Sequence, residues 1–548
     1  MTKNANKKHI KNRGIYNNLL KSLIIILLLL GVFFRLVNLD RKIYYGDEIY
    51  TSLRISGYTY LEMNQELRNG SVVSPKDLQK YQFPNREKNV VNTINGLALE
   101  ESQVTPLYFI LARFWVQWFG NSITVTRSFS AFISLLAFPG IYLLCKELFA
   151  SPLIGWIAMA LIAVSPAHVI YAQVARFYSL WILLILLSSV ALLRSIRVKT
   201  KISWGIYSVT VALGLYTQLF FGLVAIGQGI YVAVIEHFRF SRTLISYLLA
   251  SLVGLITFFP WILLIFTSPN PETVSWTQTQ QTRLTIAIRW AGIVSRTFLD
   301  IGMSPSSTLI LKLALAPLIL IVLALIVYSI YFICRSNPKR VWLFILTLIS
   351  SVGLPLILED LIFQKRYGTT RYILPSILGI HLAVAYLIST KLKDNSSQLR
   401  QKNPWIILAS MLTLMGVISC TISSQSEIWW NNSPEKNQYI LPASSLVNKS
   451  PQPLVISDEE LIDIQILGYR LEPKVRLLLV EKPNIPDIPR GFNDVFLFEA
   501  SESLRAGLSK KYNTQIKQIY PPLWKLQHHT IAGRAGVFTN PVPETESR

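Results

Sequence analysis

Residues 21–39 read KSLIIILLLLGVFFRLVNL, and residues 40–52 continue as DRKIYYGDEIYTS. The first stretch matches a membrane-spanning helix, which needs about 20 mostly apolar residues. The second stretch places the acidic pair Asp47 and Glu48 just past the end of that run. Carboxylates at the boundary between lipid and water favour chemistry on a lipid-borne substrate at the membrane surface.

The composition of all 548 residues agrees with a chain that lies mostly in lipid. Hydrophobic residues make up 51% of it, charged residues 15%, and the mean hydropathy is +0.40, whereas soluble domains carry roughly 25% charged residues. In a soluble protein the net charge of +23 would suggest nucleic acid as a partner. In a membrane protein it indicates basic cytoplasmic loops against anionic head groups, so we expect membrane lipid and no nucleic acid as partners.

Basic residues before and between the apolar runs determine the predicted orientation. Residues 1–21 are basic and no small-residue cleavage site follows the first run, which favours a cytoplasmic N-terminus and an uncleaved anchor. With that start, every short loop predicted to be cytoplasmic carries Lys or Arg, as the positive-inside rule requires. We therefore expect a multi-pass protein of a bacterial-type plasma membrane, with its active site and C-terminal domain extracytoplasmic. The candidate spans are 22–39, 128–146, 153–170, 177–195, 203–217, 219–236, 244–266, 308–333, 340–358, 372–390 and 404–422.

One further apolar segment, residues 104–119, has an ambiguous pattern because it contains Arg113. If it crossed the bilayer, the later basic loops would face outward, so we interpret it as an interfacial or re-entrant helix on the outer side. It belongs to a long outer loop, residues 40–127, in which we expect short helices lying on the membrane. A second outer loop, residues 267–307, holds an amphipathic stretch at residues 282–298.

The composition changes after Ile422. Three short strand-like runs follow, PLVIS at 453–457, VRLLLVE at 475–481 and DVFLFEA at 494–500, and helical patterns alternate with them. This alternation predicts a small soluble α/β domain. The predicted organisation is a cytoplasmic N-terminus (1–21), a membrane domain (22–422) and an extracytoplasmic α/β domain (423–548).

Asp47 and Glu48 are the first candidates for catalysis. A carboxylate beside the bilayer can act as a general base when burial and neighbouring groups tune it. Gly46 allows the tight turn that would direct such a group. The alternative interpretation is an acidic dipeptide in a hydrated loop, and the pair alone does not decide between the two.

A second candidate group is the basic set Lys365, Arg366 and Arg371 in LIFQKRYGTTRYILP, in a loop predicted to be outside. Basic residues on that side run against the positive-inside rule and therefore ask for a specific partner. Arg and Lys suit phosphate oxygens, which favours a site for the phosphate of a lipid-linked substrate. The alternatives are contacts with lipid head groups, or ion pairs with the nearby Glu359 and Asp360.

Two outer turns supply further candidates. Arg176 lies in YAQVARFY, and an Arg at membrane depth costs roughly 2.5–3.5 kcal/mol on insertion scales, so we expect a partner such as Asp47 or a substrate phosphate. Snorkelling to the interface is the alternative. Gln218 follows Tyr216 in a tight turn, where it could hydrogen-bond a sugar or be an ordinary polar turn residue. The histidines and cysteines form no metal-ligand array, so no metal ligand is assigned.

Taken in order, several motifs over roughly residues 20–390 resemble those of the GT-C glycosyltransferases. The closest branch is the polyprenyl-phosphate-sugar transferases, which include the protein O-mannosyltransferases and the aminoarabinose transferase of lipid A. The resemblance implies a GT-C fold, a membrane all-α multi-span bundle of about 11–13 transmembrane helices, here followed by the small C-terminal α/β soluble domain. The motifs are GDEIYT, TPLYFILARFWVQWFG, TRSFSAFISLLAFPGIYLLCKELF, SPAHVIYAQVARFYSL, LYTQLFFG and RYILP.

The resemblance also implies a reaction, the inverting transfer of a sugar from a polyprenyl-phosphate donor to an acceptor hydroxyl on the outer face of the membrane. The acceptor would be a lipid, a glycan or a protein. Asp47, with Glu48 beside it, would provide the general base. The departing lipid phosphate would be held by Lys365, Arg366, Arg371 and Arg176. The same motifs supply the substrate pocket that we predict, made of Tyr108, Gln173, Tyr178, Gln218 and Tyr372.

The sequence departs from the family pattern at three positions, which affects the expectation of a metal. Many relatives have Glu at the position of Val174 and His at the positions of Gln218 and, nearby, Val104. We therefore expect no required cofactor, and a divalent metal stays possible without evident ligands. Two other classes stay open, a transporter or flippase and an O-antigen ligase or polymerase, each acting on polyprenyl-linked glycans. The chain has no visible internal repeat, which a transporter often shows, and an early Asp-Glu pair is not expected of a ligase.

Overall fold

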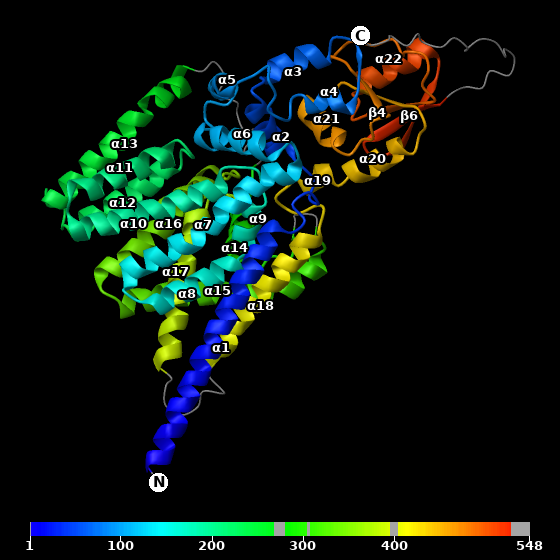
Figure 1. The fold of residues 1–548 in the computed structure, drawn as a ribbon. Coiled ribbons are helices and arrows are strands. Elements are labelled where there is room, and N and C mark those ends of the chain that lie inside the picture. Colours follow the sequence, from blue (N-terminus) through cyan, green and yellow to red (C-terminus); the bar gives the residue numbers. More distant parts are fainter. Residues whose placement is uncertain (1, 268–279, 304–306, 395–403, 528–548) are drawn as a thin grey trace. The chain divides into compact units, whose positions relative to one another are not determined.

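The structure of the protein is a computed structural model that describes residues 2–267, 280–303, 307–394 and 404–527. The side chains of residues 2–17 and 394 are outside that description. Most of the described chain is helical, and its strands form one six-stranded sheet (Figure 1). The chain divides into two compact units. We call residues 1–42 with 88–430 the membrane unit, and residues 43–87 with 431–548 the sheet unit.

The membrane unit contains long apolar helices, as predicted. Among the described residues eight helices are long and apolar enough to cross a membrane. A ninth span results if the bent pair α8 (Pro152–Ala163) and α9 (Pro166–Ala172), which meet at 63°, is one crossing. The eight are α1 (Thr2–Leu36), α7 (Ile123–Phe149), α10 (Tyr178–Val198), α13 (Arg242–Thr267), α15 (Leu309–Ser336), α16 (Lys339–Phe363), α17 (Leu374–Asp394) and α18 (Pro404–Gln425).

All eleven predicted spans fall on helices, although not all of them are long. The helices α11 (Lys201–Leu215) and α12 (Phe221–Ile235) have 15 residues each, which is shorter than the length test for a span. The count of 11–13 spans therefore depends on whether these two short helices cross. The multi-span helical bundle itself is confirmed.

Several predicted non-spanning segments are also helical. The helix α6 (Leu107–Phe119) has 13 residues, or about 20 Å at 1.5 Å per residue, so by itself it is too short to cross the hydrocarbon core. The helices α5 (Val90–Glu100) and α14 (Arg283–Ser295) are short as well. Their position on the outer surface stays a prediction. Residues 268–279 and 304–306, in the second predicted outer loop, lie outside the described residues.

The helix α17 is the centre of the membrane unit. Its apolar window is 83% buried, the largest share of the eight helices, and it packs against α8, α15 and α16. The first helix joins the bundle through α8, where a Cβ at Gly31 would lie 2.6 Å from the Cβ of Ala163. Only glycine allows the two helices to approach this closely, so Gly31 sets the position of α1.

The sheet unit has the strand order β1-β3-β2-β4-β6-β5. The central strand β2 is parallel to both β3 and β4, and the remaining pairs are antiparallel. The three predicted strand-like runs are β2, β3 and β4, and the α/β class is confirmed. The strands are β1 (Val72–Val73), β2 (Pro453–Ser457), β3 (Arg476–Leu479), β4 (Asp494–Phe498), β5 (Gln515–Tyr520) and β6 (Leu523–Gln527). The helices that precede or lie between the later strands are α19 (Pro434–Asn437), α20 (Ile440–Asn448), α21 (Leu461–Gly468) and α22 (Glu502–Tyr512).

An early segment of the chain completes this unit. Val72 and Val73 pair with β3 as an antiparallel edge strand, and α2 (Gly46–Ser56) packs against α21. The side-chain amide of Gln465 donates to the main-chain oxygen of Leu78 at 3.1 Å. Residues 43–87 therefore fold together with the C-terminal domain, while the domain limits given from the sequence stay a prediction. The two other helices of this segment are α3 (Tyr60–Leu67) and α4 (Pro75–Gln79).

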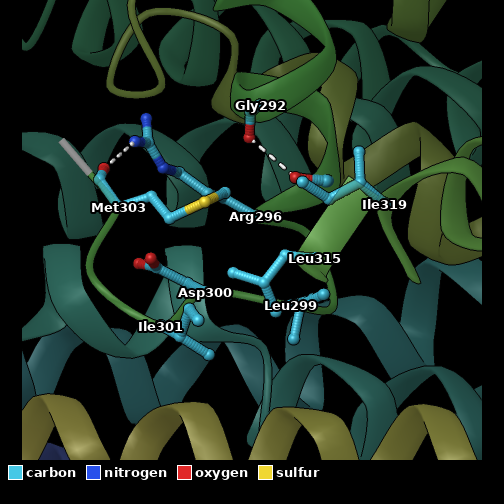
Figure 2. A pocket seen from close by; sticks show the side chains of 9 residues that line it. Gly292, Arg296, Leu299, Asp300, Ile301, Met303, Leu315 and Ile319 are labelled. Carbon is cyan, nitrogen blue, oxygen red and sulfur yellow. Dashed lines mark hydrogen bonds between the residues drawn. The ribbon is translucent and has the colours of Figure 1, made fainter. Parts of the chain in front are cut away.

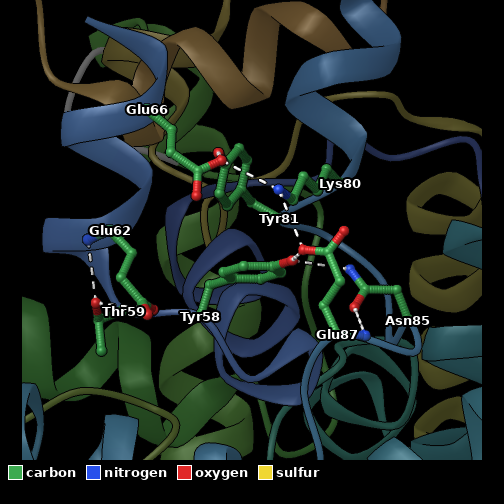
Figure 3. A network of polar contacts seen from close by, with 8 residues as sticks. All are labelled: Tyr58, Thr59, Glu62, Glu66, Lys80, Tyr81, Asn85 and Glu87. Carbon is green, nitrogen blue, oxygen red and sulfur yellow. Dashed lines mark hydrogen bonds and ion pairs between the residues drawn. The ribbon is translucent and has the colours of Figure 1, made fainter. Parts of the chain in front are cut away.

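A polar network closes the early segment on itself (Figure 3). Lys80 forms ion pairs with Glu66 at 3.1 Å and with Glu87 at 3.2 Å. The hydroxyl of Tyr58 donates to Glu87 at 2.5 Å, and that of Tyr81 donates to Glu66 at 2.6 Å. The two carboxylates thus accept from tyrosines on one side and share one ammonium on the other, which ties the residue that follows α2 to the end of the segment.

Candidate functional site

The acidic pair opens helix α2 of the sheet unit. Asp47 and Glu48 lie in its first turn, where the helix dipole favours negative charge. Ile49 and Leu53, both 0% exposed, anchor the helix in the core of the unit. Glu48 is fully buried and Asp47 is half-buried. Of the two carboxylates, Asp47 is therefore the one that a substrate could reach.

In the membrane unit, contacts join the segments that carry the other predicted site residues. The main-chain N–H of Leu107 donates to the carbonyl of Tyr216 at 3.0 Å, which fixes the start of α6 against the turn that holds Gln218. The next residue, Tyr108, is fully buried, and its hydroxyl shares a hydrogen bond with Ser130 Oγ at 2.8 Å. The structure thus brings the turn of Gln218 and Tyr108 together.

Ser130 continues this connection to Arg176. Its hydroxyl donates to the main-chain oxygen of Arg176 at 3.1 Å. The Arg176 guanidinium lies 6.0 Å from the ring centroid of Phe109 and 5.8 Å from that of Phe177, within the range of a cation–π interaction. Tyr178 is buried beside Phe177, with ring centroids 4.9 Å apart. Arg176 is therefore a buried cation. Its expected pairing with Asp47 or a substrate phosphate stays a prediction.

Arg371 and Tyr372 approach the same turn as Gln218. The ring of Tyr372 meets that of Phe220 edge to face at a centroid distance of 5.1 Å, and the Arg371 guanidinium lies 4.9 Å from the centroid of Tyr372. Lys365 is half-buried and Arg366 is exposed in the same loop, between α16 and α17.

Gln173 has a structural environment. Its Nε2 donates to the main-chain oxygens of Phe34 at 2.8 Å and Val37 at 2.9 Å, and its Oε1 accepts from Lys42 Nζ at 3.3 Å. The amide therefore holds the end of α1 against the turn after α9. A role of Gln173 in the substrate pocket stays a prediction.

Asp360 fixes the loop that carries the basic set. Its fully buried carboxylate accepts from the main-chain N–H of Tyr367 at 2.6 Å and of Gly368 at 3.1 Å, and from the indole of Trp290 at 2.8 Å. Its ion-pair partner is Arg289, on α14. Since a Cβ at Gly368 would lie 2.4 Å from Trp290, only glycine fits there. Asp360 was expected as one alternative partner of the basic set, whereas Arg289 was not predicted as a site residue.

Arg296 is a second cation that the sequence analysis missed. It follows α14 and is half-buried; its guanidinium donates to Thr370 Oγ1 at 3.3 Å and to the main-chain oxygen of Met303 at 3.2 Å, and lies 3.7 Å from the ring centroid of Trp430. The carboxylate of Asp300 accepts from the Trp430 indole at 2.6 Å. Arg296 is therefore anchored on the loop of the basic set and stacked on an aromatic ring.

A small pocket lies beside Arg296 and is amphipathic (Figure 2). Figure 2 shows the charged ends of Arg296 and Asp300 on one side and Leu315 and Ile319 on the other. These two apolar residues belong to α15, whose apolar window is only 17% buried and which would therefore face lipid. The arrangement suits a ligand with an anionic head and an apolar tail.

The charge of Arg366 acts on two other arginines of the membrane unit, Arg289 and Arg296. Burial lowers the pKa of Arg289 and Arg296 below the ordinary value, and the nearby charge of Arg366 lowers both further. Asp360 and Asp300 act in the opposite direction. A dianionic phosphate would relieve the repulsion between these cations. The sequence of the amphipathic stretch 282–298 could have pointed to these residues. Arg289 and Arg296 are seven residues apart, a spacing that places both on one face of a helix.

One group of carboxylates in the sheet unit has the spacing of a metal site. Single oxygens of Glu459, Asp463 and Glu499 lie within 4.8 Å of one another. However, Lys436 forms an ion pair with Asp463 and already supplies a positive charge to the group. Burial, and then the charge of Asp463, raise the pKa of Glu499 to about 7, while Lys436 lowers it. The sequence analysis assigned no metal ligands, and it did not single out these residues.

The comparison with solved structures finds this fold elsewhere. The crystal structure of ArnT from Cupriavidus metallidurans bound to undecaprenyl phosphate matches 94% of this chain and 99% of its own at a TM-score of 0.52 and 12% identity. The same protein in the apo state matches 93% of this chain and 98% of its own at a TM-score of 0.48 and 13% identity. The oligosaccharyltransferase of Archaeoglobus fulgidus matches 84% of this chain and 64% of its own at a TM-score of 0.45 and 12% identity. No protein-family model and no curated protein sequence matches.

The likeness to ArnT extends over nearly the whole of both chains. It shows that the chain has the fold of ArnT, here a multi-span helical membrane unit combined with a small sheet-containing unit. The fold predicted from the sequence is therefore confirmed.

Proposed function

We propose that this protein is an integral-membrane glycosyltransferase that moves a sugar from a polyprenyl-phosphate donor to an acceptor hydroxyl on the outer face of the membrane. The observation that carries the proposal is the match over 94% of the chain to ArnT, whose structure contains undecaprenyl phosphate. The amphipathic pocket beside Arg296 supports it independently, since a polyprenyl phosphate has an anionic head and an apolar tail.

The donor phosphate would be bound by the cations of the membrane unit. Lys365, Arg366 and Arg371 share one loop with Thr370, to which Arg296 donates a hydrogen bond. Guanidinium groups bind phosphate through two parallel hydrogen bonds, and positive charge held at the leaving oxygen stabilises the charge that develops there in the transition state. We therefore add Arg296 to the predicted donor site, which already includes the buried Arg176.

The acceptor would be activated by Asp47. The carboxylate removes the proton of the acceptor hydroxyl, and the oxygen attacks the anomeric carbon of the donor sugar from the side opposite the phosphate. The bond between that carbon and the phosphate oxygen breaks, and the lipid phosphate leaves with the electron pair. One displacement inverts the configuration at the anomeric carbon. The acceptor is a lipid, glycan or protein, and Asp47 lies half-buried in the first turn of its helix.

The experiment that tests this function uses the purified protein in liposomes with a radiolabelled polyprenyl-phosphate sugar and cell-envelope extract as acceptor. We expect label to move to the acceptor and free polyprenyl phosphate to appear in equal amount. Asp47→Asn should lower the rate about 10²–10⁴-fold, the usual contribution of a general base. Asp40→Asn, the same change at an exposed acid seven residues earlier, is the matched control and should keep the rate.

Two results would contradict the proposal. If labelled lipid changes leaflet without release of polyprenyl phosphate, the protein is a flippase. If Asp47→Asn transfers sugar at the wild-type rate, Asp47 has no part in the chemistry.

A further inference from the structure

A buried cation in the membrane unit lacks an acidic partner. Arg35, in the last turn of α1, is 1% exposed, and its Nη1 donates to the main-chain oxygens of Gly31 at 2.8 Å and Ala163 at 2.7 Å. Its Nη2 donates to that of Ile162 at 3.1 Å. Among the described residues no carboxylate pairs with Arg35.

Two of the three carbonyls that Arg35 contacts, those of Ile162 and Ala163, end helix α8. The last carbonyls of a helix carry partial negative charge and favour a cation there. This charge, together with the ring of Phe138 at 4.8 Å from the guanidinium, compensates only part of a full positive charge. The Nε–H of Arg35 has no hydrogen-bond partner. A buried N–H without an acceptor is costly, and each one in a native structure needs an explanation.

A small cavity, with room for about one water-sized sphere, lies beside Arg35. His168 lines it too, and this side chain is 4% exposed with no partner for its Nε2. The residues that line the cavity are Arg35, Ser134, Ala137, Ile162, His168, Ser179 and Ile182. None of them is acidic, so the only formal charge on the cavity wall is positive.

The hydroxyl groups in the cavity wall are already used as donors. Ser134 donates to the carbonyl of Ala131 at 2.6 Å, and Ser179 donates to that of Tyr171 at 3.4 Å. The Nε–H of Arg35 therefore requires an acceptor from within the cavity, and so does His168 in the tautomer that carries its proton at Nε2. Their common requirement is one compact acceptor with negative charge.

We propose that this cavity binds a chloride ion between Arg35 and His168. Chloride accepts several hydrogen bonds and carries one negative charge, which would balance the positive charge of Arg35. It is also small, whereas phosphate or a carboxylate on a longer chain would overfill the site. A water molecule could accept the same two hydrogen bonds but would leave the charge uncompensated in an apolar region, where burial of an unpaired charge is most costly.

The position of the site gives the ion a structural role. Arg35 lies against the last residues of α8 and His168 lies on α9, so the two groups stand on either side of the 63° bend between these helices. The turn after α9 carries Arg176. Bound chloride would therefore hold the bend in one geometry and indirectly keep Arg176 in place.

The test is the thermal unfolding midpoint of the full-length protein in detergent, with sodium chloride titrated against sodium gluconate at constant ionic strength. We expect a saturable rise of roughly 2–4 °C with chloride and an equivalent rise with bromide. A crystal grown in bromide should show an anomalous scattering peak beside Arg35. A midpoint that is the same in chloride and gluconate would overturn the proposal and leave water as the occupant.

Two variants connect the effect with the site. Arg35→Gln keeps the shape of the side chain but removes its charge, and it should abolish the chloride dependence of the midpoint. If this variant does not fold, His168→Phe provides the second test, because it removes the other donor without adding charge and should weaken the dependence at least tenfold in chloride concentration. A chloride response unchanged in His168→Phe, with no bromide peak at the cavity, would place the ion elsewhere and refute the site.

Discussion

The contribution that we propose for Arg296 in donor binding follows from its contacts. Its guanidinium has hydrogen bonds to a hydroxyl and a carbonyl at 3.3 and 3.2 Å, both at the long end of the normal range. A phosphate oxygen would form shorter, charge-assisted bonds, each with a net value of about 1.5–3 kcal/mol. Since 1.4 kcal/mol corresponds to tenfold, Arg296→Gln should lower kcat/KM for the donor by about 10- to 150-fold.

The assay is initial-rate sugar transfer by the purified protein over a range of donor concentrations and at saturating acceptor. Arg296→Lys keeps the charge but not the planar fork or the stacking on Trp430 at 3.7 Å, so it should lie between the wild type and Arg296→Gln. Arg283→Gln, an exposed arginine at the start of the same helix, is the matched control. A donor kcat/KM within twofold of the wild type in a folded Arg296→Gln protein would refute a phosphate role for Arg296.

Three further predictions concern stability. The pKa of Glu499 is raised from 4.5 to about 7, so between these pH values the folded state binds more protons than the unfolded state. Stability should therefore fall as the pH rises through this window. Glu499→Gln should flatten the pH dependence of the thermal unfolding midpoint and be more stable than the wild type at pH 8. Lys80→Met should destabilise the sheet unit by about 1 kcal/mol through loss of two half-exposed ion pairs, measured by chemical denaturation, while Lys76→Met should not. Gly31→Leu should prevent α1 from approaching Ala163 and lower the yield of folded protein in detergent.

Each of these predictions has an outcome that contradicts it. An unchanged pH profile in Glu499→Gln would mean that another group titrates there. Equal denaturation midpoints for Lys80→Met and Lys76→Met would show that the network is not stabilising. A monodisperse Gly31→Leu protein with the wild-type midpoint would mean that α1 can shift without cost.

The membrane helices could be predicted because lipid leaves few alternatives. A long apolar run without backbone partners in lipid must form a helix, so all eleven predicted spans coincide with helices. The buried parallel strands were equally readable, since β2 and β4 are continuous apolar runs. The strands β5 and β6 were missed because neither QIKQIY nor LWKLQ has a clear apolar alternation, and β5 is also mostly exposed.

Long-range contacts explain what the sequence could not predict about the site. The cation of Arg296 is a candidate for phosphate binding only because Thr370 and Trp430, far away in the chain, come beside it. The same holds for Gln173, whose amide is used by the end of α1. By contrast, Arg371, Tyr372 and the turn of Gln218 were named from sequence motifs, and the structure joins them through Phe220.

The edge strand Val72–Val73 affects how a truncation should be interpreted. A protein cut after Trp430 would lose the strands and α21 against which residues 43–87 fold, and the fully buried Ile49 and Leu53 of α2 would face water. Asp47 stands on that same helix. Loss of the proposed activity in such a truncated protein would thus report misfolding of the helix that carries Asp47 as readily as loss of a direct role of the C-terminal part. Only point substitutions within residues 431–548 can tell these two causes apart.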